Sequence, residues 1–176
     1  HNDNKQAIKE YDKAINLNPN YWEAFYFRGA LYIQDDNIKS IENLHKAVSL
    51  QRGPFLPDLY RFLGMSYASS GFKEKAIYYQ KEALKLDNDS ALYYCRLTEI
   101  EDCNGNIKQA IEYGEKSYSI DSTDQKLLSL LGNQHLYLDQ MEKALKYFIE
   151  YDEEFNKTDQ QGPPNLLNIG YAFWAN

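Results

Sequence analysis

Few residues of this chain have the types and spacing that catalysis or metal binding requires. None of the three histidines belongs to the His-Glu-x-x-His pattern of a zinc hydrolase, and the chain has no Cys-x-x-Cys pair. A glycine-rich phosphate loop and a Gly-x-Ser-x-Gly elbow are also missing. Residues 87–89, Asp-Asn-Asp, resemble the start of a calcium loop, but the required Gly and bidentate Glu do not follow. The sequence therefore predicts no catalytic residue, no metal site and no cofactor.

Two cysteines, Cys95 and Cys103, are eight residues apart in one predicted helix. A rise of 1.5 Å per residue separates them by about 12 Å, which is too far for a disulfide. Unpaired thiols are typical of a reducing compartment such as the cytoplasm. Two small, half-buried residues would give the same pattern, so the compartment stays open.

The charge balance limits the classes of partner. The chain has 176 residues, 26 of them acidic and 19 basic, for a net charge of -7. Nonspecific binding of nucleic acid or of an anionic membrane needs a basic face, so neither partner is expected. No run of 18 apolar residues is present, so the sequence predicts no membrane span.

Residues 60–87 predict two helices joined by a tight turn. The first helix has one face marked at i, i+3, i+4 and i+7 by Tyr60, Leu63, Gly64 and Tyr67. Gly71 ends this helix, and Ala76 and Ala83 mark the second one. The stretch is a helix hairpin that needs neighbours to cover its apolar side.

The same hairpin recurs along the chain with a period near 34 residues. The small residue of the second helix recurs at Ala7, Ser40, Ala76, Ala110 and Ala144. The small residue of the first helix recurs at Gly29, Gly64, Thr98, Gly132 and Gly170. Two independent series with one period indicate a chain built from repeated helix pairs.

This pattern resembles the tetratricopeptide repeat, whose signature is Trp-x2-Leu-Gly-x2-Tyr, then Ala-x3-Phe-x2-Ala, then Pro. The position of the Trp holds Phe25, Tyr60, Tyr94, Leu128 and Leu166. The resemblance covers essentially the whole chain. It implies an all-α fold, a right-handed α-solenoid of stacked antiparallel helix pairs in which neighbouring repeats bury a continuous core.

The repeat spacing predicts the bounds of the elements. We expect helices near residues 4–17, 20–34, 37–50, 57–70, 73–86, 90–103, 107–119, 124–137, 141–154 and 164–175. Residues 51–57 and 155–165 are predicted connectors because they contain prolines and glycine.

We expect a single solenoid over residues 1–176. It comprises a lone second helix at 1–19, repeats at 20–52, 57–88, 90–122 and 124–154, and a lone first helix at 163–176. The lone first helix has an apolar surface at Ile169, Tyr171, Phe173 and Trp174. Since solenoids usually end in polar capping helices, we expect the chain to be a piece of a larger protein.

The repeat at 90–122 is the least regular. Glu101 replaces an aromatic residue, Thr98 replaces a glycine, and Gly114 lies within a helix, where glycine costs about 0.5–1 kcal/mol. A buried unpaired carboxylate is costly, so Glu101 should reach solvent or find a partner. This repeat is either a local weak point or specialised for a ligand. In the next repeat His135 takes the aromatic position, which predicts a packed core histidine.

The resemblance also implies a function. In this family the first helices line a concave groove that holds a peptide or a partner helix, and groove residues follow directly after the Trp, Gly and Tyr positions. In this chain the rule selects Tyr26, Ala30, Ile33, Arg61, Met65, Ala68, Cys95, Glu99, Asp102, Ser129, Asn133, Leu136, Leu167, Tyr171 and Trp174. We therefore predict a non-enzymatic protein–protein interaction scaffold.

One branch of the family grips the C-terminal carboxylates of heat-shock chaperones with Lys, Asn and Arg side chains. The closest register here is Arg61, Met65, Arg96, Lys126 and Leu130, which has three cations but lacks the Asn and the final Arg. Glu99 lies nearby, where it would oppose a carboxylate and can pair with Arg96 at i, i+3. A carboxylate ligand is thus a minor alternative.

Two further hypotheses remain. The chain is compatible with the sensory or regulatory arm of a larger signalling or transcription-regulating protein. It is also compatible with self-association through apolar terminal helices, such as the one predicted near 164–175.

Overall fold

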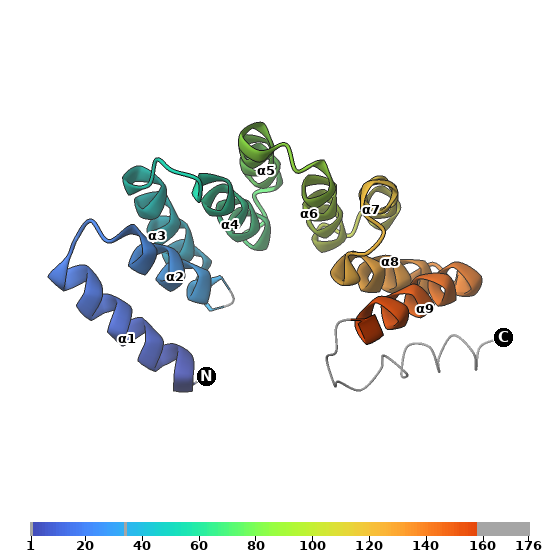
Figure 1. The fold of residues 1–176 in the computed structure, drawn as a ribbon, viewed down its shortest axis with the longest axis horizontal. Helices are drawn as coiled ribbons and strands as arrows, with labels where there is room; N and C mark the ends of the chain where they lie inside the picture. The colour runs from blue at the N-terminus through green and yellow to red at the C-terminus, as the bar shows by residue number, and fades with distance from the viewer. Residues whose placement is uncertain (1, 34, 158–176) are drawn as a thin grey trace. The chain divides into compact units, whose positions relative to one another are not determined.

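The computed structural model describes residues 2–33 and 35–157. Within these residues there are nine helices and no strands (Figure 1). They are α1 (Asn2–Leu17), α2 (Trp22–Tyr32), α3 (Asn37–Leu50), α4 (Leu56–Ser69), α5 (Lys73–Asp87), α6 (Ser90–Cys103), α7 (Ile107–Ile120), α8 (Gln125–Tyr137) and α9 (Met141–Lys157). The all-α prediction is confirmed, and each of these helices begins and ends within three residues of its expected bounds. The helix expected near 164–175 and its proposed role in self-association lie outside the described residues.

The chain forms two compact units, residues 1–89 and residues 90–176, called here the N-terminal and C-terminal units. In the N-terminal unit each helix from α1 to α5 packs against the next one along the chain. In the C-terminal unit the same holds from α6 to α9. Short turns between neighbours make such pairs antiparallel, and nearest-neighbour packing is the pattern of a helical-repeat solenoid. None of the described helices is both long and apolar enough to cross a membrane.

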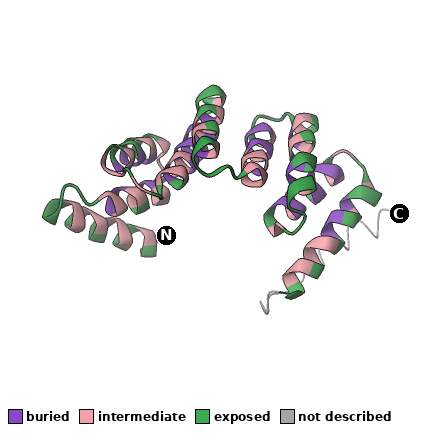
Figure 2. Cartoon of the chain, turned by 45° about the horizontal axis from the view of Figure 1, so that its top comes forward, coloured by how far each residue is buried: buried purple, intermediate pink, exposed green. Residues whose placement is uncertain are grey.

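The small residues of the repeat lie where two helices approach most closely. A Cβ atom added to Gly29 would lie 2.9 Å from the Leu44 Cγ, and one added to Gly114 would lie 2.6 Å from the Leu131 Cδ2. Both leucines are fully buried. Figure 2 shows buried residues on the helices that follow α1, from α2 to α9. The small residues that recur with a period near 34 therefore mark close contacts between helices. At each contact, a large side chain of a neighbouring helix fills the space beside the small residue.

The two irregular residues of the repeat at 90–122 have structural explanations. Glu101 is buried, and its Oε2 accepts a hydrogen bond from the Asn106 Nδ2 at 2.8 Å. The expectation that Glu101 finds a partner is confirmed. Gly114 is buried and leaves room for Leu131 of the next repeat. Its cost to the helix is thus offset by a close packing contact.

The first predicted connector is shorter than expected, and the second begins later than expected. Residues 56 and 57 belong to the first turn of α4, so only residues 51–55 join α3 to α4. Proline is tolerated in a first turn because its missing N–H has no helical partner there. Likewise α9 runs through Lys157, which takes residues 155–157 out of the second predicted loop. The rest of that loop lies outside the described residues.

Candidate functional site

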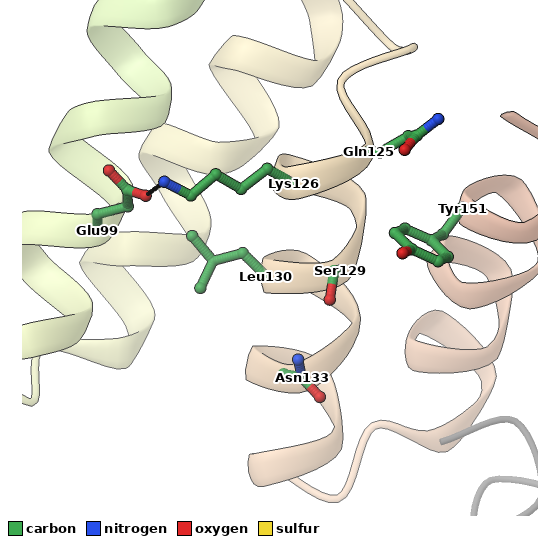
Figure 3. Close-up of a pocket in the computed structure, with 7 residues that line it drawn as sticks. All are labelled: Glu99, Gln125, Lys126, Ser129, Leu130, Asn133 and Tyr151. Carbon is green, nitrogen blue, oxygen red and sulfur yellow. Dashed lines mark ion pairs between the residues drawn. The ribbon is translucent and has the colours of Figure 1, made fainter. Parts of the chain in front are cut away.

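Two adjoining pockets lie along α8 in the C-terminal unit. The first has a volume of about 470 Å³ and is lined by Glu99, Gln125, Lys126, Ser129, Leu130, Asn133 and Tyr151 (Figure 3). The second has a volume of about 360 Å³ and is lined by Asp102, Ile107, Leu130, Asn133, Gln134 and Tyr137. Leu130 and Asn133 line both. We call the two pockets together the α8 groove.

The amphipathic sequence of α8 positions the groove. One face of the helix is fully buried and consists of Leu127, Leu128 and Leu131. Another face, spaced by three or four residues, lines the groove with Lys126, Leu130, Asn133 and Tyr137. The helix begins at Asp124, whose Oδ1 accepts hydrogen bonds from the backbone N–H groups of Lys126 and Leu127. Core packing on one side thus fixes which side chains α8 presents on the other.

Glu99 of α6 forms ion pairs with the two cations beside the groove. The Arg96 Nη1 lies 2.7 Å from the Glu99 Oε2, and the Lys126 Nζ pairs with the Glu99 Oε1 (Figure 3). The predicted pairing of Arg96 with Glu99 is confirmed. Arg61, the third candidate cation, is buried in the N-terminal unit and pairs with Asp58 and Asp87. All three cations already have carboxylate partners, which disfavours a carboxylate clamp.

The second pocket contains a buried amide next to a carboxylate. The Gln134 Nε2 donates a hydrogen bond of 3.1 Å to the Asp102 Oδ1. A carboxylate only accepts hydrogen bonds, so the Gln134 amide must turn its nitrogen toward Asp102. The Gln134 Oε1 is buried and has no hydrogen-bond partner among the described residues. The pocket therefore has unused acceptor capacity.

Several predicted groove residues meet in this region, and others do not. Six residues selected by the family rule or placed in the clamp register line the α8 groove: Glu99, Asp102, Lys126, Ser129, Leu130 and Asn133. The rule missed Tyr137, although this residue follows the selected Asn133 by four positions on the same helix face. It also missed Tyr151, which comes from α9, because it considers first helices only.

The predicted groove residues of the N-terminal unit are partly covered. Tyr26, Ala30, Ile33, Met65 and Ala68 are half-buried. The Tyr26 ring packs edge-on against the Phe62 ring, with centroids 5.0 Å apart. The N-terminal unit thus keeps these residues in contact with their neighbours, and we place the candidate site in the C-terminal unit.

The remaining predicted positions differ in exposure. Leu136 is half-buried, and Cys95 is packed in a core cluster with Leu127, Leu128 and Leu131. Tyr171 lies outside the described residues, as do Leu167 and Trp174. His135 is buried, stacks on the Tyr147 ring and contacts the Gln140 Oε1 through its Nδ1 at 2.8 Å, which confirms the predicted core histidine. Among the described residues no group of three or more His, Cys, Asp or Glu side chains is placed to hold a metal ion.

The two cysteines should differ sharply in reactivity. Cys95 is buried and Cys103 is exposed. Burial, and then the carboxylates of Asp124 and Glu99, raise the pKa of the Cys95 thiol to about 12. Partial burial, and then the carboxylates of Asp102 and Glu99, raise the pKa of Cys103 as well. Because the thiolate is the reactive form, we expect one thiol per chain to react with a disulfide reagent at pH 8, and the second only in denaturant.

The matched variants identify the reactive thiol. Cys103→Ser should abolish labelling of the folded chain, whereas Cys95→Ser should leave it unchanged. Rapid labelling of the folded Cys103→Ser variant would contradict the buried position of Cys95.

Two family models match the chain. One, described as "TPR repeat", matches residues 1–36, and another, "Tetratricopeptide repeat", matches residues 57–90. The first match spans α1 and α2, and the second spans α4 and α5. Within each of the two units, every described helix packs against the next one along the chain. The chain belongs to the tetratricopeptide repeat family.

Solved structures agree with this assignment of the chain as a tetratricopeptide repeat protein. A structure of MamA is 27% identical, covers 89% of this chain and 91% of its own, and has a TM-score of 0.63. A tetratricopeptide repeat protein from Parabacteroides merdae ATCC 43184 is 16% identical over 98% of this chain and 65% of its own, with a TM-score of 0.79. YrrB, also a TPR protein, is 18% identical over 98% of this chain and 84% of its own, with a TM-score of 0.58. None of the curated proteins compared with the chain matches it.

The position of the α8 groove can be compared with the predicted repeats. The tetratricopeptide repeat fold is generally a scaffold for protein–protein interaction. Here α8 is the predicted first helix of the repeat expected at 124–154, and α6, the first helix expected before it, contributes Glu99 and Asp102. The α8 groove therefore lies along two helices that the sequence predicts to be first helices.

Proposed function

We propose that this protein is a non-enzymatic interaction scaffold that binds an extended segment of a partner protein in the α8 groove. The observation that carries the proposal is the pair of adjoining pockets, about 470 and 360 Å³, along one face of α8. Pockets of this size accommodate side chains of a bound ligand. The proposed function is binding alone, without a catalysed reaction.

The residues that line the groove can supply binding energy for a peptide and hydrogen bonds that fix its position along the groove. Leu130, Tyr137 and Tyr151 supply apolar and aromatic surface. Tyrosine is enriched among the residues that dominate binding energy at interfaces. Ser129 and Asn133 supply side chains that can donate to a peptide carbonyl or accept from a peptide N–H. An extended segment would thus find hydrogen-bonding groups between apolar subsites.

The comparisons support this class of ligand. The structure of YrrB is described as that of a TPR protein with an unusual peptide-binding site, and the two proteins share the fold. The pairing of Arg61, Arg96 and Lys126 with carboxylates argues against a ligand anchored by its C-terminal carboxylate. We therefore propose an internal segment of the partner protein as the ligand.

A phage-displayed library of random 10-residue peptides, selected on the whole chain, tests this proposal. Selected peptides are measured by fluorescence anisotropy against wild type and Asn133→Arg, because Asn133 lines both pockets and is exposed. A bulky side chain there should obstruct the groove and weaken binding at least tenfold, without shifting the thermal unfolding midpoint.

The matched control is Asn16→Arg. This substitution adds the same charge at an exposed position of α1, in the other unit. Selected peptides should bind this variant as they bind wild type. If every selected peptide binds Asn133→Arg as tightly as wild type, the α8 groove is not the binding site.

A further inference from the structure

The second pocket of the α8 groove has a single charged residue in its lining. Asp102 is that residue, and its neighbours in the lining are uncharged. Its carboxylate accepts a hydrogen bond from the neutral Gln134 amide, and none of the ion pairs among residues 2–33 and 35–157 involves Asp102. The nearby cations Arg96 and Lys126 are both held by Glu99. The Asp102 charge is therefore not neutralised by a described cation.

Gln134 adds a second acceptor to the same pocket. Its side chain is 2% exposed, and its nitrogen is used by Asp102. Its Oε1 accepts no hydrogen bond from the described part of the chain. A buried acceptor without a partner costs free energy, which a donor supplied by a ligand would recover. Two acceptors in one pocket, one of them charged, select for a cationic donor.

The walls of the pocket suit the stem of a long basic side chain. Ile107 and Leu130 provide aliphatic surface, and Tyr137 provides an aromatic ring that is 75% exposed. Lys and Arg side chains bury their methylene stems on apolar surface and keep the charged head on polar groups. An aromatic ring also attracts a cation placed over its face. Each wall therefore matches one part of such a side chain.

Arginine fits the two acceptors better than lysine. A guanidinium presents several N–H donors in a planar fork, so that one group can reach a carboxylate and a neighbouring amide oxygen together. We propose that the Asp102 pocket binds a basic side chain, preferably arginine, of the segment held in the α8 groove. This inference rests on the proposed function, because it assigns one residue of the peptide that the groove binds.

The difference between the two acidic residues beside α8 supports the assignment. Glu99 is paired with both Arg96 and Lys126, so its negative charge is fully compensated. Asp102 is one helical turn farther along α6, and its partner among the described residues is the neutral Gln134 amide. The chain has a net charge of -7, which also favours association with a basic segment. Selectivity for a cation should therefore depend on Asp102 and not on Glu99.

Peptides selected from the random library test the inference. We expect arginine or lysine to be enriched at one position of the peptides whose binding is lost in Asn133→Arg. In the tightest of these peptides that has arginine at this position, replacing the arginine by citrulline, which has nearly the same shape without the charge, should weaken binding at least tenfold. Asp102→Asn should weaken binding of the parent peptide at least fivefold and should add little loss for the citrulline peptide.

Asp35→Asn is the matched control. Asp35 is an exposed residue of the other unit, so this variant removes the same charge without touching the pocket and should bind the parent peptide normally. Groove-bound peptides that tolerate citrulline and bind Asp102→Asn like wild type would overturn the inference and leave the proposed function standing. The citrulline comparison uses the wild-type protein. It therefore tests whether the pocket selects a positive charge even if the Asp102→Asn variant unfolds. If no selected peptide is lost in Asn133→Arg, both proposals fall.

Discussion

Replacing Phe148 with alanine is expected to lower the free energy of unfolding by about 3–5 kcal/mol. Phe148 of α9 is 0% exposed, and its ring occupies the space that Gly132 leaves on α8. Alanine would remove the ring and leave a cavity between the two helices of one repeat, since the surrounding structure relaxes only in part. Urea unfolding followed by circular dichroism measures the loss.

An exposed phenylalanine provides the comparison. Phe72, directly before α5, is 54% exposed, so Phe72→Ala should cost much less than Phe148→Ala. Equal losses for the two variants would show that the ring of Phe148 does not hold α8 and α9 together.

Adding a single methyl group at Gly132 is expected to destabilise the chain by about 1–3 kcal/mol. A Cβ atom there would overlap three atoms of the Phe148 ring, which is rigid and fully buried. The intrinsic helix preference of alanine over glycine acts in the opposite direction by about 1 kcal/mol. A net loss in Gly132→Ala, measured by urea unfolding, therefore reports the clash.

A double-mutant cycle separates the clash from any other effect of Gly132→Ala. Phe148→Leu shortens the side chain that the new methyl group meets. The double variant should lose less stability than the sum of the two single variants, because the two residues are in direct contact. Additive losses, or a Gly132→Ala variant more stable than wild type, would be incompatible with the packing described.

Helix positions were predictable because their signals are local and periodic. Each helix pair carries its own small residues, and Gly71 has a φ of 78°, a turn conformation that glycine adopts without strain. A helix bound is ambiguous where one residue type is compatible with two positions. Pro57 belongs both to the predicted connector 51–57 and to the start of the helix predicted near 57–70, and it occupies the first turn of α4. The same residue is compatible with both positions because its missing N–H matters only beyond the first turn.

The candidate site was only partly predictable. A rule based on helix position selected Glu99, Ser129 and Asn133, which line the α8 groove. It selected Cys95 on the same grounds, but this side chain is buried in the core cluster beside Leu127. Position along one helix specifies the direction of a side chain. It does not specify how closely the neighbouring helix covers that side chain.

From the sequence alone one can derive an all-α repeat protein, because the period near 34 and the small residues recur within each helix pair. Tertiary structure decided which charges are available to a ligand. Lys126 and Asp102 belong to different predicted repeats. In the tertiary structure Lys126 forms an ion pair with Glu99, whereas Asp102 accepts a hydrogen bond from Gln134. Such contacts join residues 27 and 32 positions apart, a separation over which a local pattern contains no information about distance.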